Sequence, residues 1–321
     1  MPTSCIGSVT RKCKDTMNEL AKRSLELTIQ KISKDNNIDF TKTFTDINVK
    51  FYFQKMIGSA MFGKGRISIC GLEQDTIQQL TSFVDYGTTL NERKLIQFSA
   101  GYGEKKALIF NASILSAIPT IPPDIWLNCD VINGYELQQK YINISIEEGL
   151  TLNEYCQTVA DKIGVPLEMR VQDDKYLAAK MSETTYYGNI FRLLNTIENK
   201  FPIKAIKKEY GNIVAYIDNG TLIVDYSVIP NSEQRAKQQN IVEINQDTGM
   251  VGLPEISMAG YLVNITTLLN PTIKTGDVIN LTSSQIPSAN GLYSVIGITY
   301  NGEFRGNSWY TTLTCRRVIN E

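Results

Sequence analysis

Histidine is absent from the 321-residue sequence. Because histidine is the commonest general base and metal ligand, its absence excludes Ser-His-Asp and Cys-His catalytic arrangements. No two cysteines form a Cys-x-x-Cys pair, so we expect no zinc site and buried free thiols. The six cysteines are Cys5, Cys13, Cys70, Cys129, Cys156 and Cys315. Any enzyme would have to rely on carboxylates, Lys, Tyr or Cys; we single out no catalytic, cofactor-binding or metal-binding residue and expect no cofactor.

Targeting signals and net charge are also lacking. The N-terminus, Met-Pro-Thr-Ser-Cys-Ile-Gly, has neither the charged region nor the apolar core of a signal peptide. No apolar run approaches the roughly 18 residues of a membrane helix. The sequence therefore predicts a protein kept in a reducing cytosol, without stable membrane association. Acidic side chains number 33 and basic ones 32, so net charge favours neither a nucleic acid nor an anionic membrane as a partner.

Turn residues and strand-like alternation recur from Gly249 to Val318. Turn signals lie at Gly-Leu-Pro 252–254, Leu-Leu-Asn-Pro 268–271, Gly-Asp 276–277 and Asn-Gly 301–302. Candidate strands lie at 256–265, 278–281, 291–298 and 309–318. Short strands at this spacing, with a hairpin expected at Asn301-Gly302, are typical of a small antiparallel β-barrel.

The N-terminal part shows a similar alternation, interrupted by one helical segment. Candidate strands lie at 25–29, 47–53, 66–70, 93–100, 106–114, 126–129 and 138–146. Ile77, Leu80 and Val84 recur at helical spacing. There is also a faint internal repeat. Seven residues separate Ala107 from Ile114 and Gly291 from Ile298, and a tryptophan follows each stretch, at positions 126 and 309.

Between these parts lies a segment of different composition. Thr151 and Glu154 form a capping box for a helix that ends at Gly164. A second helix is expected over 183–199, with strands at 166–171, 203–209, 213–217 and 221–228 and turns at 210–212 and 218–220. Residues 229–240 are polar and lack an apolar period, which indicates a linker or loop. Together they predict a small α+β insert.

The order of features over 249–318 resembles the C-terminal barrel of the baseplate hub proteins of contractile-tailed bacteriophages. The strand, helix, strand, Ala-Gly-Tyr turn (100–102), strand order resembles the N-terminal barrel of that family. The resemblance implies a mainly β fold in which two tail-tube-like antiparallel β-barrel domains flank the α+β insert. The implied division is an arm at 1–20, a first barrel at 21–146, the insert at 147–236 and a second barrel at 237–321.

The resemblance also implies a function. The chain would be a structural baseplate hub subunit, not an enzyme, forming a homotrimer whose six barrels adapt the six-fold tail tube to a three-fold spike and line the DNA channel. Implied partners are the tail tube protein, the central spike protein, other baseplate proteins and the tape measure protein, with DNA only passing through. The implied location is the virion, after assembly in the host cytoplasm. Because Glu321 follows the last strand directly, we expect a separate spike protein.

Two alternatives stay open. A cell-wall or polysaccharide hydrolase would need two convergent carboxylates, and the adjacent acidic pairs, Asp173-Asp174 and Glu147-Glu148, point to opposite sides of a strand and favour solvated loops. A host-receptor binding module is compatible with the 16 tyrosines.

The remaining candidate sites are explained by ordinary structural roles. Gly63-Lys64-Gly65 lacks the full phosphate-loop pattern, and Gly101-Tyr102-Gly103 is typical of a tight turn. Basic residues cluster at 11–14, 204–208 and 316–317. Each cluster could contact DNA or a protein partner, or could form a solvated strand edge.

Overall fold

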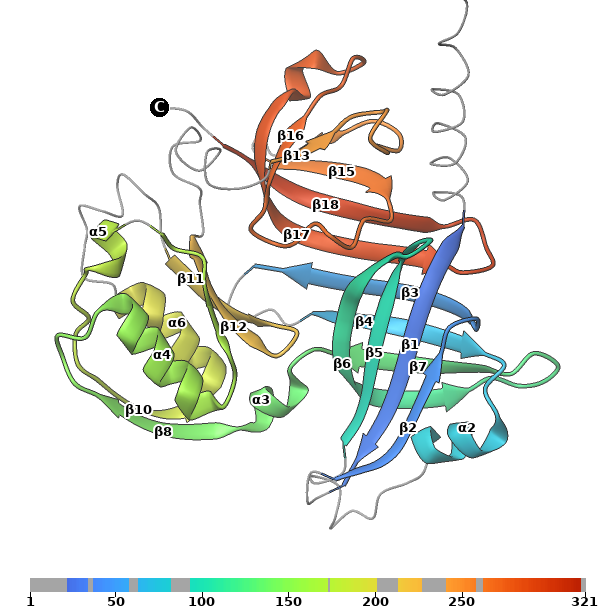
Figure 1. The fold of residues 1–321 in the computed structure, drawn as a ribbon, viewed down its shortest axis with the longest axis horizontal. Helices are drawn as coiled ribbons and strands as arrows, with labels where there is room; N and C mark the ends of the chain where they lie inside the picture. Colours follow the sequence, from blue (N-terminus) through green and yellow to red (C-terminus); the bar gives the residue numbers. More distant parts are fainter. Residues whose placement is uncertain are drawn as a thin grey trace, which may run out of the picture.

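The part of the chain that the structure describes is mainly β, with one large sheet, two small sheets and short helices (Figure 1). The computed structural model describes residues 22–33, 37–57, 63–81, 93–172, 174–200, 213–226, 241–257 and 262–318. The expected arm, the strand at 203–209, the linker at 229–240, Asp173 and the basic clusters at 11–14 and 204–208 lie outside these ranges.

The large sheet has 13 strands in the hydrogen-bonded order β14-β15-β18-β17-β3-β4-β7-β6-β5-β1-β2, with β16 beside β17 and β13 beside β16. In the first part of the chain its strands are β1 Arg23–Ile32, β2 Ile38–Phe44, β3 Asn48–Met56, β4 Lys64–Cys70, β5 Arg93–Tyr102, β6 Lys105–Pro119 and β7 Trp126–Ile132. In the last part they are β13 Val242–Ile244, β14 Glu255–Ser257, β15 Leu262–Leu268, β16 Val278–Leu281, β17 Gly291–Glu303 and β18 Trp309–Arg317.

Five consecutive strands occur twice in the same order. β3 to β7 run as β3-β4-β7-β6-β5, and β14 to β18 run as β14-β15-β18-β17-β16, with every neighbouring pair antiparallel. β4 and β15 each have 7 residues, and they pair along their whole length with β7 and β18. The two sets of strands, called here the first and second units, therefore share one topology.

The faint sequence repeat lies on corresponding hairpins, β6–β7 and β17–β18, but its residue match is wrong. Each hairpin carries one bulge, between Ile114 and Ser116 and between Val295 and Gly297. Aligning the bulges matches Ile114 with Val295 and not with Ile298. The units also differ at one edge, because β1 pairs antiparallel with β5 whereas β13 pairs parallel with β16.

Closed barrels are not confirmed. Within the described ranges the order of paired strands is an open path that ends at β14 and β2. The expectation treated the two barrels as separate, whereas β17 joins both units into a single sheet. What the pairing confirms is the mainly β architecture of the two flanking parts.

Alternating burial explains why these segments form strands. In β3, Val49, Phe51 and Phe53 are buried while Lys50 and Tyr52 are exposed, which is the period of a strand with one face on a core. One hydrophobic core includes buried residues from both units, and helix α2 Gln74–Thr81 packs on it through Leu80. Residue Val84 of the expected helix lies outside the described ranges.

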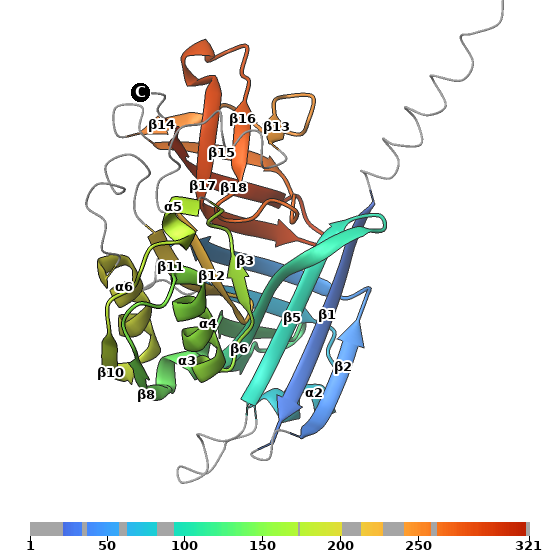
Figure 2. The ribbon, with the colours of Figure 1, turned by 60° about the vertical axis from the view of Figure 1, so that its left-hand side comes forward.

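The insert has its own core, with residues from Ile142 to Tyr226. Figure 2 shows its helices and short strands beside the large sheet. Its elements are α3 Tyr135–Gln139, β8 Tyr141–Ile146, α4 Leu152–Ile163, β9 Leu167–Met169, α5 Asp174–Leu177, β10 Thr184–Asn189, α6 Ile190–Lys200, β11 Ile213–Asp218 and β12 Thr221–Tyr226. The capping box is confirmed, since Glu154 Oε2 accepts the Thr151 N–H (2.8 Å) and the Thr151 hydroxyl accepts the Glu154 N–H (3.4 Å). This contact lowers the pKa of Glu154.

Several expected elements differ from the structure. Residues 184–189 form β10 rather than the start of a helix, because Thr184, Thr185, Tyr186 and Tyr187 are β-branched or aromatic. Residues 135–139 are helical, so the strand expected over 138–146 begins only at Tyr141. β2 and α5 were not predicted. The turn at 218–220 is confirmed, with positive φ at Asn219 (49°) and Gly220 (84°).

Candidate functional site

The strand β17 is the element that joins the two units. Its N-terminal residues pair with β16, from Gly291 opposite Leu281 to Ser294 opposite Val278. After the bulge, the same side of β17 pairs with β3, from Gly297 opposite Met56. β18 runs along its other side throughout. Because one strand belongs to two ladders, the units cannot move apart without breaking backbone hydrogen bonds.

Aromatic side chains pack tightly over this junction. The Phe51 ring lies 5.3 Å from Trp309 in an edge-on arrangement and 4.7 Å from Phe98, centroid to centroid. A Cβ on Gly302 would lie 2.5 Å from Phe51 and 2.9 Å from Trp309. The hairpin between β17 and β18 exists, but its turn follows Glu303 and does not lie at Asn301-Gly302. Both residues belong to β17, and the glycine is there because the rings leave no room for a side chain.

Arg23 of β1 holds the turn that follows β17. Its guanidinium donates to the carbonyl oxygens of Glu303 (2.7 Å), Gly306 (2.6 Å) and Asn307 (3.1 Å). It also lies 5.3 Å from the Trp309 ring centroid. One side chain of β1 thus binds three carbonyl groups of the β17–β18 turn.

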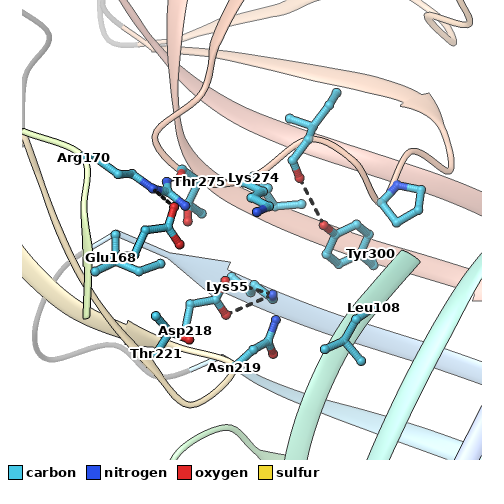
Figure 3. A pocket seen from close by; sticks show the side chains of 14 residues that line it. Lys55, Leu108, Glu168, Arg170, Asp218, Asn219, Thr221, Lys274, Thr275 and Tyr300 are labelled. Carbon is cyan, nitrogen blue, oxygen red and sulfur yellow. Dashed lines mark hydrogen bonds and ion pairs between the residues drawn. The ribbon is translucent and has the colours of Figure 1, made fainter. Parts of the chain in front are cut away.

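A small polar pocket of about 150 Å³ lies where both units meet the insert (Figure 3). Lys55 of β3 reaches Asp218 of the insert, with Nζ 3.0 Å from Oδ1. The Asn133 amide donates to the same carboxylate (3.3 Å), and Asn219 Oδ1 accepts the backbone N–H of Asn111 (3.1 Å). The β11–β12 turn is thereby fixed to the first unit.

Arg170 fixes the insert to the second unit. Its Nη1 donates to the carbonyl of Thr275 (2.6 Å), and it lies within ion-pair distance of Glu168 (2.8 Å) and the buried Asp225 (3.6 Å). A Cβ on Gly276 would lie 2.3 Å from Asp225 Oδ2, so only glycine permits this approach. The turn predicted at Gly276-Asp277 is the segment that receives Arg170.

Burial raises the pKa of two titratable groups beside the pocket. It raises the pKa of the Asp277 carboxyl, although the Lys274 N–H donates to it (2.7 Å). It also raises the pKa of the Tyr300 phenol, whose hydroxyl donates to the Ile273 carbonyl (3.5 Å). The two carboxylates that line the pocket, Glu168 and Asp218, each contact a cation. The arrangement is suited to holding three parts of the chain together.

The acidic pairs considered from sequence do not meet in this pocket. Glu147 and Glu148 lie in an exposed turn, and Asp174 begins α5. Among the described residues, no group of three or more Cys, Asp and Glu side chains could hold a metal ion. Cys70, Cys129, Cys156 and Cys315 are free thiols, and burial raises the pKa of Cys129 and of Cys156 to about 12. No helix within the described ranges is long and apolar enough to cross a membrane.

The other candidates have structural positions. Gly65 lies in β4 against Phe53, so 63–65 is not a phosphate loop. Gly101 and Tyr102 end β5, and a Cβ on Gly101 would clash with the Lys105 carbonyl. Arg317 donates to the carbonyl of Asn290 (3.3 Å).

Sequence reasoning missed Arg23, Lys55 and Arg170 as junction residues. The Asp218-Asn219-Gly220 turn was visible in the sequence, but nothing local indicates that its carboxylate pairs with Lys55, 163 positions away.

The fold is similar to that of several phage tail proteins. A 43 kDa tail protein of prophage MuSo2 from Shewanella oneidensis superposes with a TM-score of 0.56 at 8% identity, over 91% of this chain and 96% of that one. The tail protein from Neisseria meningitidis MC58 gives 0.57 at 9% identity, over 92% and 96%. The E. coli c3393 protein, a component of the type VI secretion system described as structurally similar to the T4 tail proteins gp27 and gp5, gives 0.53 at 8% identity, over 85% and 74%.

The chain belongs to the family of baseplate hub gp41, whose model matches residues 25–315. No curated protein matches the sequence. The protein is therefore a structural protein of the phage tail baseplate, and its location is the virion. The resemblance to baseplate hub proteins is confirmed.

Proposed function

We propose that this chain forms a homotrimeric ring in the baseplate hub of a contractile tail. Each chain contributes two tail-tube-like β-barrels, so three chains present six barrels around a lumen. One face of the ring binds the six-fold tail tube protein, and the other seats a three-fold central spike protein. The ring acts as an adaptor between the two symmetries and lines the channel through which DNA passes.

The observation that carries this proposal is the five-strand order that occurs twice and is joined through β17. Two units of one topology, fixed side by side, give each chain two similar surfaces. Three chains can then imitate a six-fold ring. The two polar anchors of the insert, Lys55–Asp218 and Arg170–Thr275, support a rigid arrangement of the units.

The proposed domains are an arm at 1–20, a first barrel at 21–146, the insert at 147–236 and a second barrel at 237–321. The separate core of the insert supports a distinct domain between the two barrels, but that core begins at Ile142 of β8 and therefore before residue 147. Other baseplate proteins and the tape measure protein are further proposed partners, and assembly takes place in the host cytoplasm. The role is mechanical and not enzymatic. The nearly balanced charge of the chain suits a channel wall along which DNA slides.

Native mass spectrometry and electron microscopy of the purified chain, alone and mixed with candidate tube and spike proteins, test the proposal. We expect a trimer whose projection shows six similar lobes around a lumen. A chain that stays monomeric in every mixture, or a ring without pseudo-six-fold symmetry, would overturn the adaptor role. Hydrolysis of peptidoglycan or polysaccharide in a dye-release assay would favour the hydrolase alternative instead.

A further inference from the structure

The junction between β17 and β3 offers a template for contact between copies of the chain. β6 is the strand of the first unit that corresponds to β17. Its ladder with β5 ends at Ser113, as the ladder of β17 with β16 ends at Ser294. A one-residue bulge against the next strand follows in both cases, at Leu115 and at Ile296. The segment after the bulge is the part of β17 that pairs with β3.

In β6 the corresponding segment, residues 116–119, is open on one side. It pairs with β7, but no strand in the described part of the chain pairs with its other side. β14 corresponds to β3, and it is the terminal strand of the paired order. Among the residues that the structure describes, the two strands that would form a second junction are thus both open edges, one on each unit.

Both edges expose apolar side chains. Ile118 is 61% exposed and Leu115 50% on β6, and Ile256 is 43% exposed on β14. Ile256 corresponds to Phe53, because their partners Val263 and Gly65 occupy matching places in β15 and β4. Phe53 is completely buried at the filled junction. An apolar open edge invites pairing with another strand, and these two edges match each other as β17 matches β3.

We propose that Ile118 and Pro119 of β6 in one chain lie antiparallel to and opposite Ser257 and Ile256 of β14 in the next chain, repeating the internal junction between subunits. This inference rests on the proposed trimer and specifies its contact surface. The contact is head-to-tail, since each copy offers a β6 edge to one neighbour and a β14 edge to the other, and three such contacts close a ring. Pro119 has no N–H, so this ladder has fewer hydrogen bonds than the β17–β3 ladder within the chain.

The register of the β17–β3 ladder within the chain predicts the register of the β6–β14 contact between chains. Thr299 lies opposite Gln54 in the β17–β3 ladder, and the corresponding pair between subunits is Ile118 opposite Ser257. The Phe304 N–H donates to Val49 (2.9 Å), while the Glu303 N–H donates to Ser308 on the other side (2.7 Å). Even-numbered residues of this part of β17 therefore bond to β3, and the Thr299–Gln54 pair is not hydrogen-bonded. Such pairs have Cα atoms about 4.5 Å apart, within disulfide range.

The test is disulfide cross-linking of the full chain carrying Ile118→Cys and Ser257→Cys, with Cys5, Cys13 and Cys70 replaced by serine. The other three native thiols are buried. A matched control combines Ser257→Cys with Ile38→Cys, because Ile38 is 59% exposed on β2, the opposite end of the sheet. All three positions are outside the cores, and circular dichroism verifies the fold of each variant.

Under mild oxidation we expect covalent dimers and trimers from most chains of the 118/257 variant. The 38/257 control and each single variant should give none. A trimer by native mass that cross-links at 38/257, or fails to do so at 118/257, overturns the β6–β14 contact while the proposed hub trimer stands. Absence of any trimer, alone or with tube and spike proteins, overturns both.

Discussion

The ion pair between Lys55 and Asp218 gives the sharpest test of how the insert is held. The two side chains are 10% and 19% exposed, and Nζ lies 3.0 Å from Oδ1. Within the described residues, Asp218 is the only salt-bridge partner of Lys55. Asp218→Ala leaves a nearly buried ammonium without its counter-charge, and we expect a loss of about 3 kcal/mol in the free energy of unfolding.

Lys55→Met should cost less, about 1–2 kcal/mol, because the methionine fills the space of the lysine stem and Asp218 keeps its contact with Asn133. The double variant leaves no orphaned charge, so it should cost about 1–2 kcal/mol as well, giving a coupling energy of about 2–4 kcal/mol. Glu73→Ala is the control, since the Lys42–Glu73 pair (2.6 Å) has Glu73 73% exposed and should change stability by less than about 1 kcal/mol.

Urea denaturation followed by circular dichroism measures these costs, and hydrogen exchange of the β11–β12 amides reports which part opens first. If the double variant costs the sum of the single ones, or Lys55→Met costs more than Asp218→Ala, the reasoning from an uncompensated buried charge is refuted.

Three further predictions follow from the junction and its surroundings. Gly302→Ala should cost about 1–3 kcal/mol, because its Cβ would lie 2.5 Å from the Phe51 ring; an unchanged melting temperature would contradict the contact. Arg23→Ala should speed hydrogen exchange in the β17–β18 turn, since three backbone carbonyls lose their donor, whereas slower or equal exchange would argue against this anchor. The contact with Arg66 and the hydrogen bond from Ser116 lower the pKa of Asp130, so its contribution to stability is present above the ordinary aspartate pKa of about 4 and is lost as the pH falls through the folded value. The melting temperatures of the wild type and Asp130→Asn should therefore converge on going from about pH 6 to about pH 3, and a constant difference would count against the shift.

Periodicity predicted most strands of the large sheet, because their cores lie on one face. The alternation of Val49, Phe51 and Phe53 and that of Trp309 to Cys315 are examples, and both segments are strands. Where β-branched and aromatic residues preceded a helix, as at 184–189, the helical period was extended too far toward the N-terminus. Tertiary packing explains why Asn301-Gly302 is not a turn. This dipeptide is typical of hairpin turns, but here Gly302 lies within a strand because the neighbouring rings leave no room for a side chain.

The candidate site could be predicted only in fragments. The turns at 218–220 and 276–277 were visible from their Asn, Asp and Gly residues, because backbone conformation has a local signature. Their partners Lys55 and Arg170 were not, because an ion pair between distant segments leaves no pattern in either one. The joining of the two units into one sheet could not be predicted from the sequence either. The pairing of β17 with β3 depends on which strand edges meet in the fold, and hydrophobic periodicity carries no information about that.

The shared strand has a consequence for biosynthesis. Arg23 binds the Glu303 carbonyl across a separation of 280 residues. The N-terminal strands β1 and β3 are therefore translated long before β17, which contacts them. At typical elongation rates this delay is on the order of ten seconds to a minute. During that interval β3 would remain an unpaired apolar edge on the nascent chain, and chaperone demand should be greatest then. A chain truncated before residue 291 should consequently aggregate more readily than the whole protein.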